Sequence, residues 1–314
     1  MSNFYNGLRV VVTGGAGMVG SALVMLLVEK GANVLVQDDF SHGRTYIKGA
    51  QYVTSDAGNE TACMAALKGA DCLFNLAAYV AGVQFNQRNH ALMYERNARL
   101  QTAPIMAAAA HRVPHVLQTS SVCVYSPEAN TPAIESDIGA LPHLANEGYA
   151  WAKRMGEGIV RWADLPHVVI VRPSNIYGPR DYFDERAHVI PALIKKAMRD
   201  EVIVVNGSGH ERREFIYVDD VARGMLVALE RGSHRSAYNI GTGGDTCVSI
   251  RELVAHIQMV TGMARKSVRF SQDYDSGDPA RHSDVSRLRA LGWRHHISLE
   301  SGLQNTVEWY RGQM

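Results

Sequence analysis

A glycine-rich run near the amino terminus, Thr13-Gly-Gly-Ala-Gly-Met-Val-Gly20, is the feature that most restricts how this chain can fold. It follows the apolar, β-branched residues 8–12 and precedes an apolar segment with helical spacing, which together predict a strand, a turn and a helix. Gly14 permits the tight turn, Gly17 lets the backbone approach a pyrophosphate at the positive helix terminus, and Gly20 lets the helix pack closely on the strand. The run therefore predicts a dinucleotide-binding unit.

The next apolar run, residues 33–38, ends in a carboxylate, Asp38. An acid about twenty residues after the glycine loop accepts hydrogen bonds from an adenosine ribose and repels a 2′-phosphate. Arg44 follows it and could instead pair with such a phosphate. We predict NAD as the cofactor, with NADP as the alternative.

A tyrosine and a lysine, Tyr149 and Lys153, lie four residues apart further along the chain. On a helix this spacing puts both side chains on one face, where the ammonium can hold the phenol hydroxyl and favour its phenolate. A phenol whose pKa falls below its reference value of about 10 becomes a base near neutral pH. Together with the glycine loop, the pair predicts proton transfer beside a nicotinamide.

Apolar runs alternate with helical segments along most of the chain, which predicts an α/β fold with a doubly wound parallel sheet of the Rossmann type. The pattern changes after Pro173, and no long Pro/Gly/Ser linker separates the parts. A smaller, interleaved C-terminal substrate domain is therefore expected. We assign residues 1–172 to the dinucleotide-binding domain, with 214–240 returning to it, and residues 173–213 and 241–314 to the substrate domain.

Composition narrows the classes of function. The 314 residues include 32 basic and 31 acidic side chains, so the net charge of +1 gives no diffuse field for nucleic acid or an anionic membrane. No eighteen-residue apolar run and no secretory signal pattern occurs, which predicts a cytoplasmic enzyme. No metal site is expected, because no paired metal-ligand spacing occurs among the cysteines, which are Cys63, Cys72, Cys123 and Cys247.

Sequence motifs that follow one another in the same order over almost the whole chain resemble those of the extended short-chain dehydrogenase/reductase family. Within that family they resemble the nucleotide-sugar epimerases and dehydratases. Beyond the glycine loop and the Tyr/Lys pair, the motifs are Asp56, Asn75-Leu-Ala-Ala78, Asn97, Thr119-Ser-Ser121, Arg172-Pro-Ser-Asn-Ile-Tyr-Gly-Pro179, Arg213-Glu-Phe-Ile-Tyr-Val-Asp-Asp220 and Tyr238-Asn-Ile-Gly-Thr242. The resemblance implies an active site between the two domains and a homodimer formed through a helix pair. It implies cofactor contacts at Gly14, Gly17, Met18, Val19, Gly20, Asp38, Asp56, Ala77, Asn97, Tyr149 and Lys153.

In this family a serine at a strand end meets the reacting substrate oxygen, and counting back from Tyr125 selects Ser121 as the partner of Tyr149 and Lys153. Cys123, two positions beyond, would face the same side of a strand. The chain here resembles the GDP-sugar 3,5-epimerases, GDP-mannose 3,5-epimerase and GDP-fucose synthase, in which a cysteine exchanges a proton beside a carbonyl. A small, inert, buried cysteine is the alternative.

A second acid/base group is implied at His188, whose segment resembles that of GDP-fucose synthase, and imidazole can act either way near neutral pH. The resemblance also implies that Asn175, Arg213 and Arg281 contact the substrate nucleotide, since guanidinium suits phosphate. Either arginine could instead form a structural ion pair. Other histidines, such as His42, receive no role.

The sequence thus predicts an NAD-dependent nucleotide-sugar epimerase that inverts the 3- and/or 5-position of a GDP-sugar after transient oxidation at carbon 4. One alternative is a 4-epimerase of the UDP-glucose/galactose type, in which Cys123 is inert. Another is an epimerase/reductase that consumes NADPH on a preformed 4-keto sugar. A non-catalytic NAD(P)-binding sensor is a different class of protein, and the intact set of Ser121, Tyr149 and Lys153 argues against it.

Overall fold

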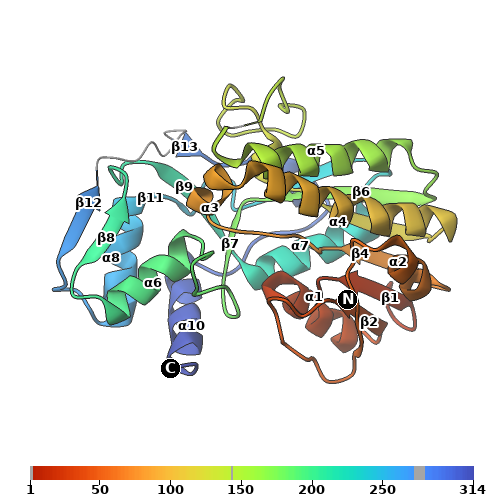
Figure 1. The fold of residues 1–314 in the computed structure, drawn as a ribbon, viewed down its shortest axis with the longest axis horizontal. Coiled ribbons are helices and arrows are strands. Elements are labelled where there is room, and N and C mark those ends of the chain that lie inside the picture. The colour runs from red at the N-terminus through yellow and green to blue at the C-terminus, as the bar shows by residue number, and fades with distance from the viewer. Residues whose placement is uncertain (1–2, 143, 272–279) are drawn as a thin grey trace.

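The computed structural model describes residues 3–142, 144–271 and 280–314, and its core is a seven-stranded parallel sheet (Figure 1). The strands run in the order β10-β6-β5-β4-β1-β2-β3. Their bounds are β1 Arg9–Thr13, β2 Asn33–Asp38, β3 Gln51–Thr54, β4 Cys72–Asn75, β5 His115–Thr119, β6 His167–Pro173 and β10 Ala237–Ile240. The order reverses between β1 and β4, and in sheets of this kind ligands bind beyond the carboxyl ends of the strands at such a point.

Helices cover both faces of this sheet, as Figure 1 shows. Successive side chains of β1 pack on opposite faces of the sheet: Val10 and Val12 belong to one buried cluster, and Val11 belongs to the other. The first cluster includes residues of α1 (Met18–Glu29) and α7 (Val218–Arg231). The second includes residues of α2 (Glu60–Leu67), α4 (His90–Ala110) and α5 (Glu147–Trp162). The predicted doubly wound sheet is confirmed.

The smaller part of the molecule contains two further sheets. One has the order β11-β9-β13 with β7 paired to β9, and the other pairs β8 with β12. These strands are β7 Asn175–Tyr177, β8 Ile203–Asn206, β9 Arg212–Tyr217, β11 Cys247–Ser249, β12 Val268–Ser271 and β13 Ala280–Arg281. The helices here are α6 Val189–Arg199, α8 Ile250–Thr261, α9 Ser286–Ala290 and α10 Leu299–Arg311.

The chain passes between the two parts more than once. α7 packs on α1, and β10 pairs with β6 in the large sheet. The segment at 214–217, which the sequence assigned to the returning part, is instead the end of β9. Its backbone pairs with β7 and β11 there, so the return to the large sheet begins with α7. No helix among the described residues is long and apolar enough to cross a membrane.

Candidate active site

The glycine loop borders a cavity of about 410 Å³ at the carboxyl ends of the central strands. Its wall includes these residues of the predicted cofactor site: Gly14, Gly17, Met18, Val19, Gly20, Asp38, Asp56 and Ala77. A Cβ at position 20 would lie 2.1 Å from the Gly14 carbonyl oxygen, so only glycine lets α1 approach the loop this closely. The backbone at the start of α1 therefore borders a space that can hold a dinucleotide.

Asp38 ties the end of β2 to the glycine loop. Its Oδ2 accepts a hydrogen bond from the Ala16 amide at 3.0 Å, and its Oδ1 accepts one from the Phe40 amide at 2.9 Å. Burial raises the pKa of this carboxyl, and the two amides act against that rise. Arg44, the alternative partner for a cofactor phosphate, is exposed and is not part of the cavity wall.

Asn97, a predicted cofactor contact, positions a loop beside the cavity. It lies on α4, fully buried, and is not part of the cavity wall. Its side-chain oxygen accepts from the Tyr79 amide at 3.0 Å, and its nitrogen donates to the carbonyls of Tyr79 and Met93 at 2.9 and 2.8 Å. Asn97 therefore holds the loop after β4, from which Tyr79 borders the cavity.

Tyr149 and Lys153 lie one turn apart on α5, with the Lys153 ammonium nitrogen 5.5 Å from the centre of the Tyr149 ring. The lysine is buried, and its Nζ donates to the Thr119 carbonyl at 2.8 Å, which fixes α5 against the end of β5. Burial lowers the pKa of Lys153 to about 7, although the charges of Cys123 and Glu157 oppose this. The buried amine can therefore gain or lose a proton near neutral pH.

The pKa of Tyr149 is raised and not lowered as the sequence predicted. Burial raises this pKa above the usual value, and the charge of Cys123 raises it further, whereas a hydrogen bond with Ser121 lowers it. The prediction considered only the nearby ammonium and left out the cost of burying a phenolate. These shifts favour the protonated phenol, whose hydroxyl is placed to exchange a proton with the Ser121 hydroxyl.

Ser121 and Cys123 are brought together by a turn and not by the side-to-side alternation of a strand. β5 ends at Thr119, and residues Val122–Val124 form a short 3₁₀ helix, η1. Ser121 caps this helix, and its Oγ accepts a hydrogen bond from the Cys123 amide at 3.2 Å. Cys123 is partly exposed, and its charge acts on both Tyr149 and Lys153. These four side chains form one cluster.

A buried network supports this cluster, and the sequence reading gave its members no such role. Arg172 on β6 donates to both carboxylate oxygens of Glu157, one turn after Lys153, at 2.8 and 2.7 Å. Its third nitrogen donates to the hydroxyl of Tyr125, directly after η1, at 3.0 Å. Tyr125 in turn donates to Asn239 at 2.6 Å. The network fixes α5 and η1 on the large sheet.

His188 lies at the start of α6, where it borders the cofactor cavity together with Asp181. Its Nδ1 is 3.8 Å from an oxygen of the Asp181 carboxylate. Burial opposes the charged imidazole, but the carboxylate outweighs it and raises the pKa of His188. His188 is thus in the wall of the cavity and has no hydrogen bond to Cys123 or Tyr149 among the described residues.

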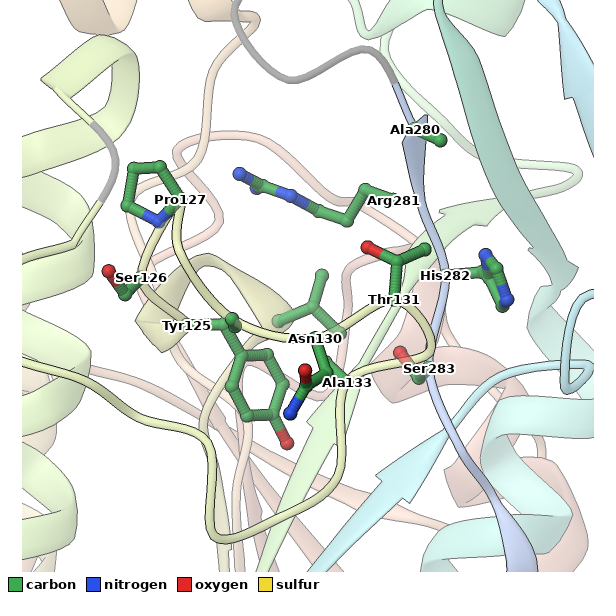
Figure 2. A pocket seen from close by; sticks show the side chains of 12 residues that line it. Tyr125, Ser126, Pro127, Asn130, Thr131, Ala133, Ala280, Arg281, His282 and Ser283 are labelled. Carbon is green, nitrogen blue, oxygen red and sulfur yellow. The ribbon is translucent and has the colours of Figure 1, made fainter.

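The residues predicted to bind the substrate nucleotide lie on the four-stranded sheet of the smaller part. Asn175 on β7 donates to the Glu214 carbonyl at 2.8 Å. Arg213 on β9 and Arg281 on β13 are paired in register on neighbouring parallel strands, which places their Cα atoms side by side. Figure 2 shows Arg281 extending from β13 across a second pocket of about 140 Å³, which also includes Tyr125 in its wall. This pocket therefore adjoins the turn that carries Cys123.

Several residues of the cofactor cavity had no sequence signal of their own, among them His42, Tyr79, Asp181 and Tyr182. They come from loops after β2, β4 and β7, and the contacts of loop residues depend on how the chain folds and not on a local sequence pattern. Across the described part of the chain, no group of three or more His, Cys, Asp and Glu side chains has a geometry that could hold a metal ion.

The chain belongs to the NAD dependent epimerase/dehydratase family, whose family model matches residues 10–241. GDP-L-fucose synthase from Escherichia coli (strain K12) is 33% identical over 325 residues, which cover 96% of this chain and 96% of that protein. GDP-L-fucose synthase 1 from Arabidopsis thaliana is 33% identical, with 96% and 93% covered. The crystal structure of UDP-glucose 4-epimerase from Thermotoga maritima with UDP-glucose has a TM-score of 0.87 at 27% identity and covers 98% of this chain and 99% of that one.

The fold, the cluster on α5 and these relatives together identify an NAD(P)-dependent enzyme of the sugar-nucleotide epimerase class. The resemblance that the sequence motifs indicated is therefore confirmed, including the likeness to GDP-fucose synthases.

Proposed function

We propose that this enzyme inverts the 3- and/or 5-position of a GDP-sugar through a transient ketone at carbon 4. The observation that carries the proposal is the position of Cys123, one hydrogen-bonded turn after Ser121, where negative charge on the thiol raises the pKa of both Tyr149 and Lys153. A thiol so close to the group that handles the carbon-4 hydroxyl is placed to exchange a proton at a carbon beside it. The GDP-L-fucose synthase relatives support the choice of GDP.

Each residue of the cluster has a distinct task in this proposal. Ser121 and Tyr149 hold the carbon-4 oxygen and move its proton, and Lys153 stabilises negative charge that develops on the phenol. Cys123 exchanges a proton on one face of the sugar ring, and His188, whose Asp181 partner favours its charged form, exchanges one on the opposite face. Asn175, Arg213 and Arg281 bind the substrate nucleotide.

The dinucleotide belongs in the 410 Å³ cavity, where the glycine loop offers backbone amides to its pyrophosphate. When bound, it supplies the hydride acceptor and donor. We expect NADH to bind more tightly than NADPH, because the Asp38 carboxylate in the cavity wall would face a 2′-phosphate. Fluorescence titration with the two dinucleotides tests this, and equal or tighter NADPH binding would contradict it.

An epimerase/reductase is the second candidate, because GDP-L-fucose synthases and dTDP-4-dehydro-6-deoxy-D-allose reductase from a Streptomyces species are among the relatives. A reductase consumes one reduced dinucleotide for each sugar converted, whereas an epimerase consumes none. Net loss of nicotinamide absorbance on a 4-keto substrate would favour the reductase. A 4-epimerase, the activity named for the Thermotoga maritima structure, predicts no exchange of carbon-bound hydrogen with solvent.

The decisive experiment is turnover of a panel of GDP-, UDP- and dTDP-sugars in heavy water by the wild type and by Cys123→Ser. We expect the wild type to incorporate deuterium at carbons next to carbon 4. The serine variant should still reduce bound dinucleotide transiently but should incorporate about 10²-fold less deuterium, because a serine hydroxyl is far too weak an acid to replace the thiol.

Cys247→Ser is the matched control, because this cysteine is also partly exposed but lies on β11, in the four-stranded sheet of the smaller part. It should leave deuterium incorporation unchanged. If Cys123→Ser exchanges deuterium at the wild-type rate, another residue is the base. If the wild type incorporates no deuterium while it turns over substrate, the enzyme is a plain 4-epimerase.

We also propose a homodimer in the cytoplasm, formed through α4 and α5. These helices pack along each other and carry exposed apolar side chains, namely Tyr94, Met106 and Trp162, with exposed fractions of 43, 46 and 81%. A second copy would cover these residues. Sedimentation should give twice the monomer mass for the wild type, and Trp162→Glu should shift it toward the monomer.

A further inference from the structure

The segment at residues 180–188 lies between β7 and α6 (Figure 1). It contributes residues to the wall of the 410 Å³ cavity. We call it the strap. Asp181, Tyr182 and His188 of the strap form part of the same cavity wall as the glycine loop and His42. The strap belongs to the smaller part of the molecule by chain order, whereas the rest of this wall belongs to the large sheet and its loops. The cavity is thus enclosed from both parts.

The strap is anchored on both sides. In the smaller part, Lys195 on α6 donates to the Phe183 carbonyl at 2.8 Å, and the Phe183 ring stacks on Tyr310 of α10 at 4.0 Å between ring centres. On the other side, Arg180 donates to the hydroxyl of Ser21 in α1 at 2.8 Å. These contacts fix the strap at Arg180 and at Phe183, and Arg186 makes the contacts of the part that follows.

Arg186 joins the strap to the loops of the large sheet. Its guanidinium contacts Nε2 of His42, in the loop after β2, and its carbonyl accepts a hydrogen bond from the Gly82 amide at 2.9 Å. Asp184 holds the same guanidinium at 3.1 Å. His42 also packs against Tyr182, with 5.2 Å between ring centres. The contact therefore links the strap to the loop after β2, and both of these segments contribute residues to the cavity wall.

The imidazole must be neutral for Nε2 to accept from a guanidinium. Burial lowers the pKa of His42, and the charge of Arg186 lowers it further, while the carboxylates of Asp38, Asp39 and Asp184 oppose the fall. The neutral form is thus the one that the surroundings favour near neutral pH. A glutamine at position 42 would keep an acceptor oxygen, whereas an alanine would remove it.

We propose that His42 and Arg186 form a clamp that retains the bound dinucleotide between turnovers. The inference rests on a dinucleotide occupying the cavity, as in the proposed function, and not on the choice of sugar. A dinucleotide between the glycine loop and the strap would contact both walls, and the clamp adds to the hydrogen bond of Arg180 with Ser21 in holding these walls together. Retention matters for an epimerase, because the hydride taken from carbon 4 must return to the same sugar.

The test measures the rate at which NADH leaves the purified enzyme, from the loss of its fluorescence when excess NAD is added without any sugar. We expect Arg186→Ala and His42→Ala each to release NADH at least about tenfold faster than the wild type, the effect of one charge-assisted hydrogen bond. His42→Gln should stay within about threefold of the wild type. The double alanine variant should be no faster than the faster single variant, because both changes break one contact.

Arg112→Ala is the matched control, because it removes an arginine from a surface ion pair with Asp164, 2.9 Å long and remote from the cavity. It should release NADH at the wild-type rate. Release within about twofold of the wild type for both alanine variants at positions 42 and 186 would overturn the clamp. Release from His42→Gln as fast as from His42→Ala would overturn it too, because the imidazole would then act by packing alone.

Thermal unfolding shows whether each variant is folded, and Arg186→Lys provides a milder change if the alanine variant is not. Lysine keeps the charge but cannot present a planar fork to both Asp184 and His42, so intermediate release is expected. Wild-type release from Arg186→Lys together with wild-type release from His42→Ala would also overturn the clamp. Because no sugar is present, loss of the clamp and failure of the proposed epimerase reaction are separate results.

Discussion

Burial governs the charge states of the two side chains that α5 places side by side. It raises the pKa of the Tyr149 phenol and lowers that of the Lys153 ammonium to about 7, so both shifts favour the neutral forms. Charge on one residue would stabilise charge of opposite sign on the other, since the Lys153 nitrogen lies 5.5 Å from the centre of the Tyr149 ring. Phenolate formation is therefore expected to be coupled to protonation of Lys153.

Tyr149→Phe tests the role of the phenol hydroxyl in proton transfer. The substitution keeps the ring beside Lys153 and removes the hydroxyl that bonds Ser121, so the fold and dinucleotide binding should be nearly intact. Turnover should fall by about 10²–10⁴-fold, the usual effect of losing a general base. Steady-state kinetics on the accepted sugar nucleotide, with NADH titration as the control, measure both effects. Turnover within about threefold of the wild type would rule out this role for Tyr149.

The sequence predicted the parts of the site that depend on local spacing. Tyr149 and Lys153 needed only the period of a helix, and the glycine loop needed only the strand before it and the helix after it. The turn at Ser121 was missed, because a strand end and a 3₁₀ helix differ by hydrogen bonds that have no residue pattern. The contact between His42 and Arg186 joins positions 144 residues apart, so only the folded chain shows it.

At the scale of elements, the junction of β1 and α1 depends on two glycines with different functions. A Cβ at Gly20 would meet the Gly14 carbonyl oxygen at 2.1 Å, which forces the helix away from the loop. A Cβ at Gly17 would lie 3.5 Å from the same oxygen, an ordinary contact, but position 17 borders the cofactor cavity. Only glycine at position 20 permits this packing, and we propose that Gly17 leaves room for the dinucleotide.

Alanine substitutions should separate these two functions. Gly20→Ala should lower the free energy of unfolding by about 1–3 kcal/mol, because backbone must move to relieve the overlap. Gly17→Ala should unfold like the wild type but bind NADH at least about tenfold more weakly, because the methyl group occupies the path of the pyrophosphate. Denaturant unfolding and NADH titration of both variants measure this. Equal stability losses in the two variants would show that Gly17 is structural as well.

The alternation of apolar runs and helices was sufficient to predict the large sheet, because every strand in it is parallel and its central strands are buried on both faces. For the smaller part, the sequence predicted the residue ranges of a domain but not its strands or their pairing. Its strands are short, such as β13 with two residues and β7 with three, and β9 gains its partners from segments far along the chain. Such strands have too few residues for a period-two pattern to appear.

Across the whole molecule, one buried network connects the two parts at the level of the active site. Arg172 on β6 joins Glu157 of α5 to Tyr125 after η1, and Tyr125 donates to Asn239 on β10. Asn239 donates in turn to the carbonyl of Asp284, in the segment that follows Arg281. The same hydrogen-bond network therefore positions the proposed catalytic cluster and the segment next to Arg281, which we propose to bind the substrate nucleotide.

The opposite end of the large sheet carries three neighbouring histidines. His115 and His167 begin β5 and β6 as register partners with ring centres 5.6 Å apart, and His234 lies 6.1 Å from His167. Burial lowers the pKa of His115 and of His167, and in each case a neighbouring imidazole lowers it further. For His115 the charge of Asp71 acts in the opposite direction and does not reverse the shift.

These shifts set the sign of a pH dependence. The pKa of each histidine is lower in the folded state than its unfolded value of about 6.5, so the unfolded chain binds more protons in between. The stability gained from neutral histidines is thus fully present above about pH 6.5 and is lost as the pH falls through the folded pKa values. The melting temperature should therefore decrease from pH 7 to pH 5, and the double variant His115→Gln/His167→Gln should show a smaller decrease.

The control is His210→Gln, which changes a histidine at an exposed position and should keep the wild-type dependence of the melting temperature on pH. An unchanged slope in the double variant would mean that the histidine pair does not titrate on unfolding and that other groups cause the loss of stability.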